Sequence, residues 1–282
     1  MAEGYAVPES LVSTDWVAQH LKSPGVVIAE VDYDPASAYE LGHLPGAPLI
    51  DWKKDINDPV RRDILSQEAF DAMCSRLGIE PGSTVVLYGD NRNWFAAFAF
   101  WVFKMYGHKD VRLMNGSRRT WLEQKRPVTD EKPTTKPTTY KGQGLHFGLR
   151  ALLPQVLVAL DRPDVALVDV RSGKEFTGEI VAPPEYPTEA AQRGGHIPGA
   201  TNIPWALAVA DDDTFKSVAE LRELYASHGI TPNKAIITYC RIGERSSHTW
   251  FVLKYLLGYD NVVNYDGSWS EWGNGVGLPI AR

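Results

Sequence analysis

Cys240 stands between a short apolar segment and a predicted helix, in a setting that favours nucleophilic chemistry. The segment "CRIGERS" (240–246) adds two arginines and a glycine to this strand-to-helix turn. Backbone N–H groups at the start of a helix lack intrahelical partners, and the helix dipole adds positive potential there. Such a turn predicts an anion cradle in which a cysteine is a thiolate near neutral pH. We therefore interpret Cys240 as a nucleophile.

The neighbours of Cys240 strengthen this interpretation. Arg241 and Arg245 remain charged at physiological pH and deepen the positive potential. Gly243 permits a curled backbone conformation that a Cβ atom would resist. His248 lies within the predicted helix, and we expect a structural or surface role for it because a field-stabilised thiolate needs no base. Cys74 lies in the helical segment "AFDAMCSRLG" and is expected to be a buried core thiol.

An internal repeat shows which elements must position these residues. "GHLPGA" (42–47) returns as "GHIPGA" (195–200), and the segment 85–117 matches the segment 236–268. The second match has a constant offset of 151 residues, with anchors at Tyr88 and Tyr239 and at Gly107 and Gly258. This period is too long for a solenoid, so the sequence predicts two halves of a duplicated domain.

Each half has the alternation of strands and helices that is typical of an α/β fold. Short apolar runs at 26–32, 84–89, 165–170 and 235–240 predict buried parallel strands. The segments 66–78 and 217–229 have helical periodicity and end in glycine. We predict one parallel sheet per half, flanked by helices. The expected domains cover 5–127 and 149–282, with a linker rich in Pro, Thr and Lys at 128–148.

Features present in both halves are assigned to the fold. His43 and His196 occupy the same position of the repeated turn, so we interpret both as turn-bracing residues. Asp32 and Asp169 each close the first strand of their half, and we expect both to be structural.

Features present in one half are candidates for function. In the first half, the positions of Cys240, Arg241 and Arg245 are taken by Gly89, Asp90 and Trp94. The second half has Arg171 and Glu175 where the first is aligned with Asp34 and Ala38. It is also longer before its turn, since 19 positions separate Phe176 from Gly195 and 3 separate Tyr39 from Gly42. The second half is therefore expected to carry the chemistry.

Composition excludes several other classes of protein. The net charge of −6 over 282 residues gives no chain-wide basic field for nucleic acid. No stretch of 18 apolar residues predicts a membrane span, and the first residues do not resemble a signal peptide. Two distant cysteines do not form a disulfide framework. We expect a cytoplasmic protein without nucleic-acid or membrane partners.

The repeat, the paired turns, "VDVR" and the "CRIGERS" loop resemble the two-domain rhodanese family, and most of all its actinobacterial thiosulfate sulfurtransferases. The resemblance covers nearly the whole chain. It implies two tandem rhodanese-like domains, of which the first lacks the cysteine and the second is catalytic. It also implies double displacement: the thiolate attacks the outer sulfur of thiosulfate, sulfite leaves, and a persulfide remains until an acceptor such as cyanide or a thiol takes the sulfur. No metal or separate cofactor is expected.

The resemblance also assigns roles to residues. Cys240 would carry the persulfide, and the first half would lend Trp94 and Phe95 to the site, although both also suit helix packing. Trp205 is a further possible pocket wall. Some family members have a basic residue at the position of Glu175. A carboxylate there cannot hold thiosulfate, so we expect Glu175 to orient Arg241 or Arg245. Arg171 is expected to have a supporting role. The predicted substrate-binding segment comprises Arg241, Ile242, Gly243, Glu244, Arg245 and Ser246.

Three alternatives stay open. The 3-mercaptopyruvate sulfurtransferases share the fold, but their loop typically lacks arginines, whereas a doubly basic loop suits a dianion such as thiosulfate. Cysteine phosphatases of this fold need arginine after five intervening residues, and that position here is Ser246. A non-enzymatic rhodanese-like binding module is disfavoured because Cys240 is retained.

Overall fold

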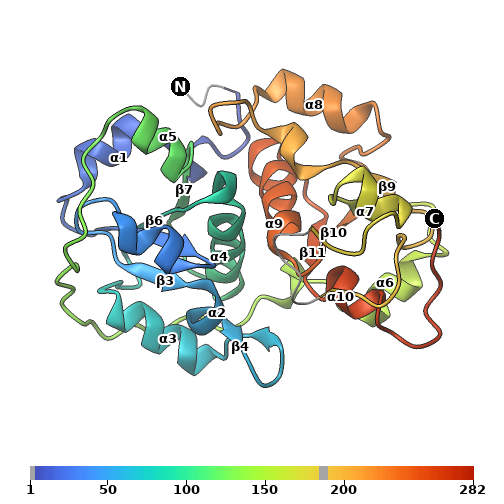
Figure 1. Ribbon diagram of the computed structural model, residues 1–282, viewed down its shortest axis with the longest axis horizontal. Coiled ribbons are helices and arrows are strands. Elements are labelled where there is room, and N and C mark those ends of the chain that lie inside the picture. Colours follow the sequence, from blue (N-terminus) through green and yellow to red (C-terminus); the bar gives the residue numbers. More distant parts are fainter. Residues whose placement is uncertain (1–3, 184–189) are drawn as a thin grey trace. The chain divides into compact units, whose positions relative to one another are not determined.

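The protein forms two compact units, described here by a computed structural model of residues 4–183 and 190–282 (Figure 1). The first unit contains Val7–His146 and Ala210–Phe215. The second contains Gly4–Ala6, the described part of Phe147–Val209, and Lys216–Arg282. Each unit has the α/β architecture that the sequence predicts, with a parallel sheet between helices.

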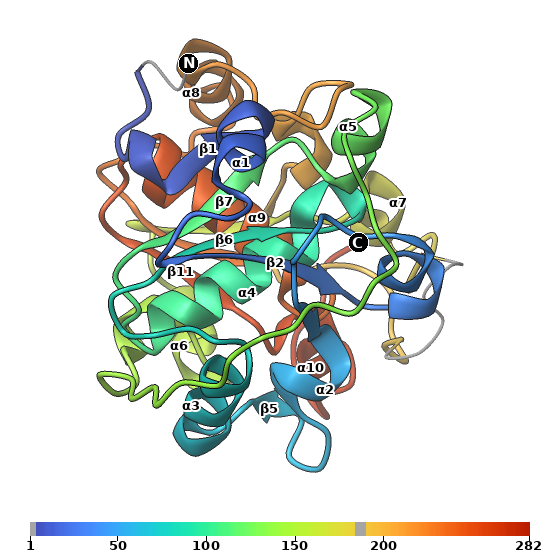
Figure 2. The same cartoon turned by 90° about the vertical axis from the view of Figure 1, so that its left-hand side faces the viewer.

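The first unit is built on five parallel strands in the order β1-β7-β6-β2-β3. Figure 2 shows α1 on one side of these strands and α4 on the other. A small antiparallel pair, β4 and β5, lies outside this sheet. The strands are β1 (Leu11–Ser13), β2 (Val26–Asp32), β3 (Leu49–Asp51), β4 (Asn57–Asp58), β5 (Asp63–Ile64), β6 (Thr84–Tyr88) and β7 (Val111–Asn115); the helices are α1 (Thr14–His20), α2 (Trp52–Asp55), α3 (Gln67–Arg76), α4 (Trp94–Met105) and α5 (Arg118–Glu123).

Alternating side chains of β6 divide the core of the first unit into two layers. Val86 and Tyr88 pack with Val17 of α1 and Trp121 of α5. Most of α4 is apolar and buried, as expected for a helix that covers a sheet face. A sheet covered on both faces explains why its strands read as continuous apolar runs.

The second unit is built on four parallel strands in the order β11-β10-β8-β9. Ile237 and Tyr239 of the central strand pack with Val156 of α6 and Trp269 of α10. On the opposite face, the Thr238 hydroxyl donates to a backbone carbonyl of α9. The strands are β8 (Val165–Asp169), β9 (Thr201–Asn202), β10 (Ala235–Tyr239) and β11 (Val262–Tyr265); the helices are α6 (Leu153–Ala159), α7 (Gly173–Thr177), α8 (Val218–Ala226), α9 (Glu244–Phe251) and α10 (Ser268–Trp272).

The two repeated turns confirm the structural role predicted for their histidines. The His43 ring stacks on Tyr39 at 3.8 Å and forms a hydrogen bond with the Tyr39 carbonyl. His196 stacks on Phe176 at 3.6 Å and bonds the Phe176 carbonyl in the same way. The longer insertion that precedes the second turn includes residues 184–189, which lie outside the described residues.

The strand register corrects one alignment made from the sequence. Tyr88 pairs with Glu30, and its counterpart Tyr239 pairs with Asp169. Glu30, not Asp32, is therefore the equivalent of Asp169, and Asp32 occupies the position of Arg171. The Val-Asp pairs at 31–32 and 168–169 suggested the other match, but nine positions separate Glu30 from Tyr39 whereas seven separate Asp169 from Phe176.

The segment that follows α5 is ordered against the first unit rather than extended between domains. Thr129 pairs with the backbone of His43, and Thr138 donates to Ser75. Tyr140 is buried, and its hydroxyl contacts His108 at 3.0 Å. This segment has the composition of a flexible linker, but a few hydrogen bonds and one buried aromatic side chain hold it against the first unit.

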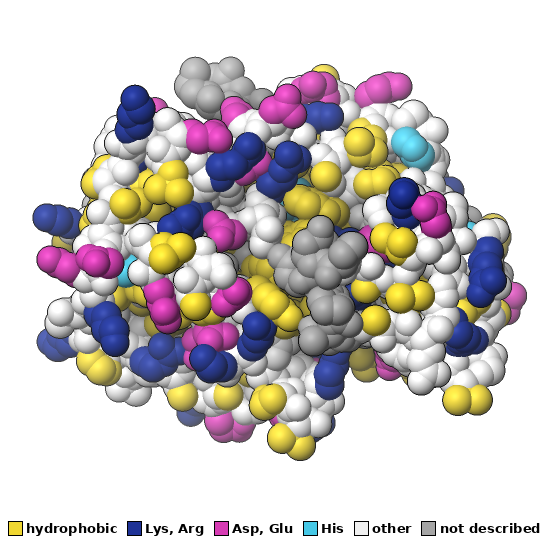
Figure 3. All heavy atoms as spheres, in the orientation of Figure 1, with side chains coloured by type: hydrophobic (Ala, Val, Ile, Leu, Met, Phe, Trp, Pro, Cys, Tyr) yellow, Lys and Arg dark blue, Asp and Glu magenta, His cyan; other side chains and the backbone are white. Residues whose placement is uncertain are grey.

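The surface is mixed in charge, and the helices are short. Figure 3 shows basic and acidic side chains interspersed on one face. Across the described ranges, no helix combines the length and apolarity needed to cross a bilayer.

Candidate active site

Cys240 lies at the carboxyl end of the central strand β10, directly before α9. The chain turns between them through Gly243, which has φ of 99°. A Cβ atom on Gly243 would also lie 2.7 Å from the Asp266 side chain. Glycine is therefore required here both for its positive φ and for space, as the sequence indicated.

The Cys240 sulfur is held inside the curled loop. Its Sγ accepts a hydrogen bond from the Gly243 N–H at 3.2 Å and faces the Ser246 hydroxyl at 3.6 Å. The Cys240 N–H donates to the Ser268 hydroxyl at 3.0 Å, which fixes the residue from behind. On another side, Sγ lies 3.2 Å from the Glu244 carboxylate. The loop thus presents donors and one carboxylate to the same sulfur atom.

This environment corrects the expectation of a resting thiolate. Burial raises the pKa of the Cys240 thiol, and the charge of Glu244 raises it further. Arg245 and the hydrogen bonds from Ser246 lower the pKa, but they do not outweigh the first two effects. The arginines and the helix terminus favour a thiolate, but desolvation and the carboxylate within the loop oppose it.

Glu175 is the ion-pair partner of Arg245. The two side chains form a bidentate pair with N–O distances of 2.9 and 3.0 Å, and both are buried. Glu175 Oε2 also accepts from the Ser172 N–H and hydroxyl, in a capping box at the start of α7. Burial alone would raise the pKa of Glu175, but Arg245 and these hydrogen bonds lower it below its ordinary value.

Arg171 supports the site through the fold. Its guanidinium forms a buried pair with Asp169 at 2.6 Å and donates to the Gly195 carbonyl of the repeated turn. It also lies 4.5 Å from the Trp269 ring, within cation–π distance. These contacts join the end of β8 to the turn and to α10.

The charges of the loop are more balanced than the two arginines suggested. Arg241 is buried, and Arg245 is paired with Glu175 and lies 3.6 Å from Glu244. The immediate surroundings of Cys240 therefore contain two carboxylates as well as two guanidinium groups.

The corresponding loop of the first unit cannot hold a cysteine. A Cβ atom on Gly89 would lie 2.4 Å from the Val31 carbonyl oxygen. The carboxylates of Glu30 and Asp32 are buried near this loop, where burial raises the pKa of Asp32 to about 7. The loss of the nucleophile in this half is thus accompanied by a changed backbone and a different set of charges.

The two aromatic residues predicted from the first unit lie at the start of α4. The Phe95 ring is buried and stacks with Tyr33 at 5.3 Å, while Trp52 meets it edge-on at 5.5 Å. Trp94 contacts Phe95 in a T-shaped arrangement at 5.4 Å. Both residues contribute to packing within their own unit, and their contribution to the site stays a prediction.

Three other residues considered from the sequence are also located. His248 is buried in α9 and meets Trp205 edge-on at 5.2 Å, so it is not a surface residue. Cys74 is buried in α3, where desolvation raises the pKa of its thiol far above the ordinary value. This environment fits the inert core thiol that the sequence predicted.

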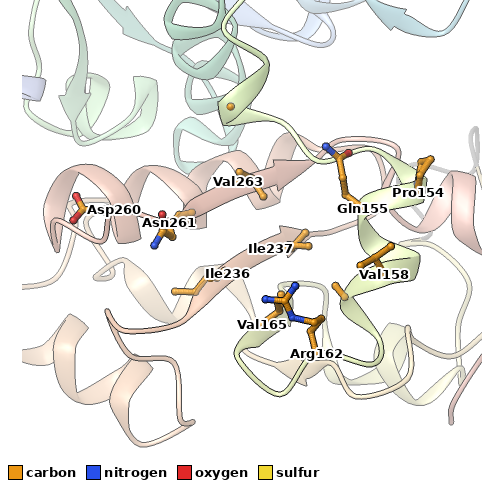
Figure 4. Close-up of a pocket in the computed structure, with 14 residues that line it drawn as sticks. Pro154, Gln155, Val158, Arg162, Val165, Ile236, Ile237, Asp260, Asn261 and Val263 are labelled. Atoms are coloured by element: carbon orange, nitrogen blue, oxygen red, sulfur yellow. The ribbon is translucent and has the colours of Figure 1, made fainter.

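A pocket of about 550 Å³ in the second unit lies away from Cys240. Figure 4 shows Ile236, Val263 and Val158 around it, beside the first residues of β10 and β11. In the first unit, the equivalent positions on α1 and β7 carry Trp16 and Arg112, whose guanidinium lies 5.3 Å from the indole ring. The second unit carries the smaller side chains of Gln155 and Val263 there, and both line the pocket.

Two residues that touch Cys240 were not predicted from the sequence to do so. Glu244 was included in the loop without a specific role, and Ser268 was not considered. The spacing of four residues between Cys240 and Glu244 at a helix start was a usable signal, because a curled turn folds such residues back on each other. Ser268 lies 28 residues away and carries no local signal.

The chain is similar to known proteins over its whole length. A family model described as "Rhodanese-like domain" matches residues 13–124 and 153–274. "Sulfur carrier protein TtuD" of Thermus thermophilus is 57% identical over 99% of both chains. Proteins named "Putative thiosulfate sulfurtransferase" in Saccharopolyspora erythraea and Mycolicibacterium smegmatis are each 52% identical over 96% of both chains.

Solved structures show the same fold. The anaerobic ergothioneine biosynthesis enzyme from Chlorobium limicola has a TM-score of 0.85 at 26% identity, over 99% of this chain and 71% of that chain. A structure of EanB with ergothioneine covalently linked to a persulfide cysteine has a TM-score of 0.84 at 25% identity, over 98% and 70% of the two chains.

Proposed function

Because this chain belongs to the rhodanese family, we propose that it transfers the outer sulfur of thiosulfate to a thiophilic acceptor through a persulfide on Cys240. The chain is a sulfurtransferase, as the relatives at about 50% identity over nearly its full length indicate. The observation that carries the proposal is the position of the Cys240 sulfur inside a loop whose Gly243 N–H and Ser246 hydroxyl face it.

The loop suits the charge that develops in this reaction. Attack of Cys240 on thiosulfate forms a sulfur–sulfur bond, and the bond to the sulfonate breaks as sulfite leaves with the electron pair. Donors fixed around Sγ in a buried site stabilise the negative persulfide without reorganising. Arg241 lies next to Cys240 in the chain and supplies positive charge for the dianionic donor. Glu175 holds Arg245 in one orientation beside the loop.

Thiosulfate remains the favoured donor over 3-mercaptopyruvate. The names of two relatives that cover this chain almost completely support it. Glu244 and Glu175 offset the two arginines, so the charge of the loop favours a dianion less than the sequence indicated.

A second candidate function concerns the acceptor. The 57% identity to a protein named as a sulfur carrier supports delivery of the persulfide sulfur to another protein rather than to a small molecule. Both candidates use the same Cys240 persulfide and differ in the second half-reaction.

A donor comparison tests the proposal. The rates of sulfur transfer from thiosulfate and from 3-mercaptopyruvate to cyanide are measured with the wild-type protein and with Cys240→Ser. We expect a clear preference for thiosulfate and no transfer by the variant. A preference for 3-mercaptopyruvate would overturn the donor assignment, and transfer by Cys240→Ser would overturn the nucleophile.

A further inference from the structure

The contact between the Glu244 carboxylate and the Cys240 sulfur has a chemical consequence. Glu244 Oε2 lies 3.2 Å from Sγ, and both side chains are buried. An ionised carboxylate only accepts hydrogen bonds, so a thiol at this distance donates its proton to Glu244. The resting pair therefore shares one proton between a sulfur and an oxygen that are enclosed together.

Persulfide formation requires this proton to leave the sulfur. The attacking species is the thiolate, and the product is a negative persulfide beside the same carboxylate. Two negative charges at such a separation in a buried site repel each other strongly. A Glu244 side chain that takes the proton removes one of the two charges at the moment when the other forms.

We propose that Glu244 is a catalytic residue that accepts the Cys240 proton when the persulfide forms and returns it when the sulfur leaves. The inference rests on the proposed persulfide chemistry. In the first half-reaction, the Cys240 thiol, the Glu244 carboxylate and thiosulfate become the Cys240 persulfide anion, neutral Glu244 and sulfite. The Sγ–S bond forms, the S–S bond of thiosulfate breaks, and the total charge stays at minus three.

The second half-reaction restores the pair. Cyanide or a thiolate takes the outer sulfur, and the bond between the two sulfur atoms breaks with its electrons on Cys240. Neutral Glu244 then protonates the thiolate, so no proton is exchanged with solvent over the cycle. The Gly243 N–H and the Ser246 hydroxyl contact the sulfur in the resting state and are placed to stabilise it in both charge states.

Other charged groups around the pair are held in pairs of their own. Arg245 lies 3.6 Å from Glu244 and is bound by Glu175 of α7. Asp266, which packs against Gly243, is bidentately paired with Arg150, and Asp169 is paired with Arg171. The remaining titratable and charged groups of the loop and α9 are Arg241 and His248. All of these are present equally in the variants described next.

The pH dependence of persulfide formation tests the proposal. In a pair that shares one proton, the reactive form has the proton on Glu244 and a thiolate on Cys240. The fraction of this form does not depend on pH as long as the pair holds one proton. The single-turnover rate of the wild type with thiosulfate is therefore expected to stay level from pH 6 to 8. Glu244→Gln must lose the thiol proton to solvent, so its rate rises about tenfold per pH unit over this range. Glu244→Asp keeps a carboxylate and restores the level profile. Glu220→Gln, at an exposed capping position of α8, behaves as the wild type. A level profile in Glu244→Gln would overturn the proposal.

A second measurement does not depend on the donor. Absorbance of the Cys240 thiolate is titrated in wild-type and Glu244→Gln proteins, with Cys240→Ser subtracted as background. We expect the pKa of the thiol to fall by about one to two pH units in Glu244→Gln, because a like charge is removed. An unchanged pKa would overturn the proposal. Failure of thiosulfate to modify Cys240, together with the expected titration, would instead refute the proposed donor and leave the proton-sharing pair established.

Discussion

Replacement of Glu175 by glutamine is predicted to destabilise the second unit strongly. The change keeps the size of the side chain and its ability to cap α7, since glutamine also serves in a capping box. It removes the negative charge from a bidentate pair with distances of 2.9 and 3.0 Å. The Arg245 guanidinium stays charged and only 4% of the residue is exposed, so it would lose its bidentate partner and keep only the longer contact of 3.6 Å with Glu244.

The magnitude follows from this burial. Removing one member of a buried ion pair costs about 3–5 kcal/mol of the free energy of unfolding when the remaining charge is uncompensated. Because Glu244 still lies 3.6 Å from Arg245, we expect a loss of about 3 kcal/mol, at the lower end of this range. Glu220→Gln is the matched control. Glu220 occupies the same capping-box position after Ser217 as Glu175 does after Ser172, but it is exposed and has no buried arginine partner. We expect this control to unfold like the wild type.

Urea denaturation followed by circular dichroism measures both variants. The pKa of Glu175 is lowered in the folded protein, so its contribution is present above the unfolded pKa of about 4.3 and is lost as pH falls through the lower folded value. The difference between wild type and Glu175→Gln should therefore be largest near neutral pH and narrow under acid conditions. Equal effects of Glu175→Gln and Glu220→Gln would refute the reasoning.

The other predictions concern the first unit and the two cysteines. Burial, with a smaller effect from Asp32, raises the pKa of Glu30 to about 9, so the folded unit keeps a proton that the unfolded chain releases and loses stability as pH rises from about 5 to 9. Because the pKa of Asp32 is also raised, to about 7, Glu30→Gln should remove the part of this slope between about pH 7 and 9 in thermal melts, and an unchanged slope there would contradict the assignment. Phe95→Ala should cost about 3–5 kcal/mol in urea denaturation, as expected for a buried aromatic side chain, and a loss below about 1 kcal/mol would contradict its place in the core. Cys74→Ser should leave sulfur transfer nearly intact while Cys240→Ser abolishes it, and equal losses would refute this division of roles.

The fold was predictable because both halves of the sequence contain the same pattern of strands and helices. The repeated anchors Tyr88 and Tyr239 fall at the ends of equivalent central strands, and apolar runs coincide with parallel strands in both units. The alignment failed between the first strand and the turn, where Asp32 was matched to Asp169. Because the two halves differ in length here, the sequence does not indicate where the two-residue gap in the alignment belongs. The strand pairing does, since it places Glu30 opposite Tyr88.

The candidate site was predictable in its residues more than in its electrostatics. Cys240 and Gly243 follow from local pattern and from comparison of the halves. Glu175 was expected to pair with Arg241 or Arg245, and the structure shows Arg245 as its partner. The raised pKa of the Cys240 thiol depends on burial and on the distance to Glu244, and neither quantity is contained in local composition. Ser268 reaches the Cys240 amide only because β11 is adjacent to β10 in the sheet.

Mass spectrometry of the protein after treatment with thiosulfate tests the central claim most directly. The peptide that contains Cys240 should carry one added sulfur atom, and cyanide should remove it while thiocyanate appears. The peptide that contains Cys74 should stay unmodified and serves as the internal control. An unmodified Cys240 under conditions in which thiosulfate is consumed would contradict the account.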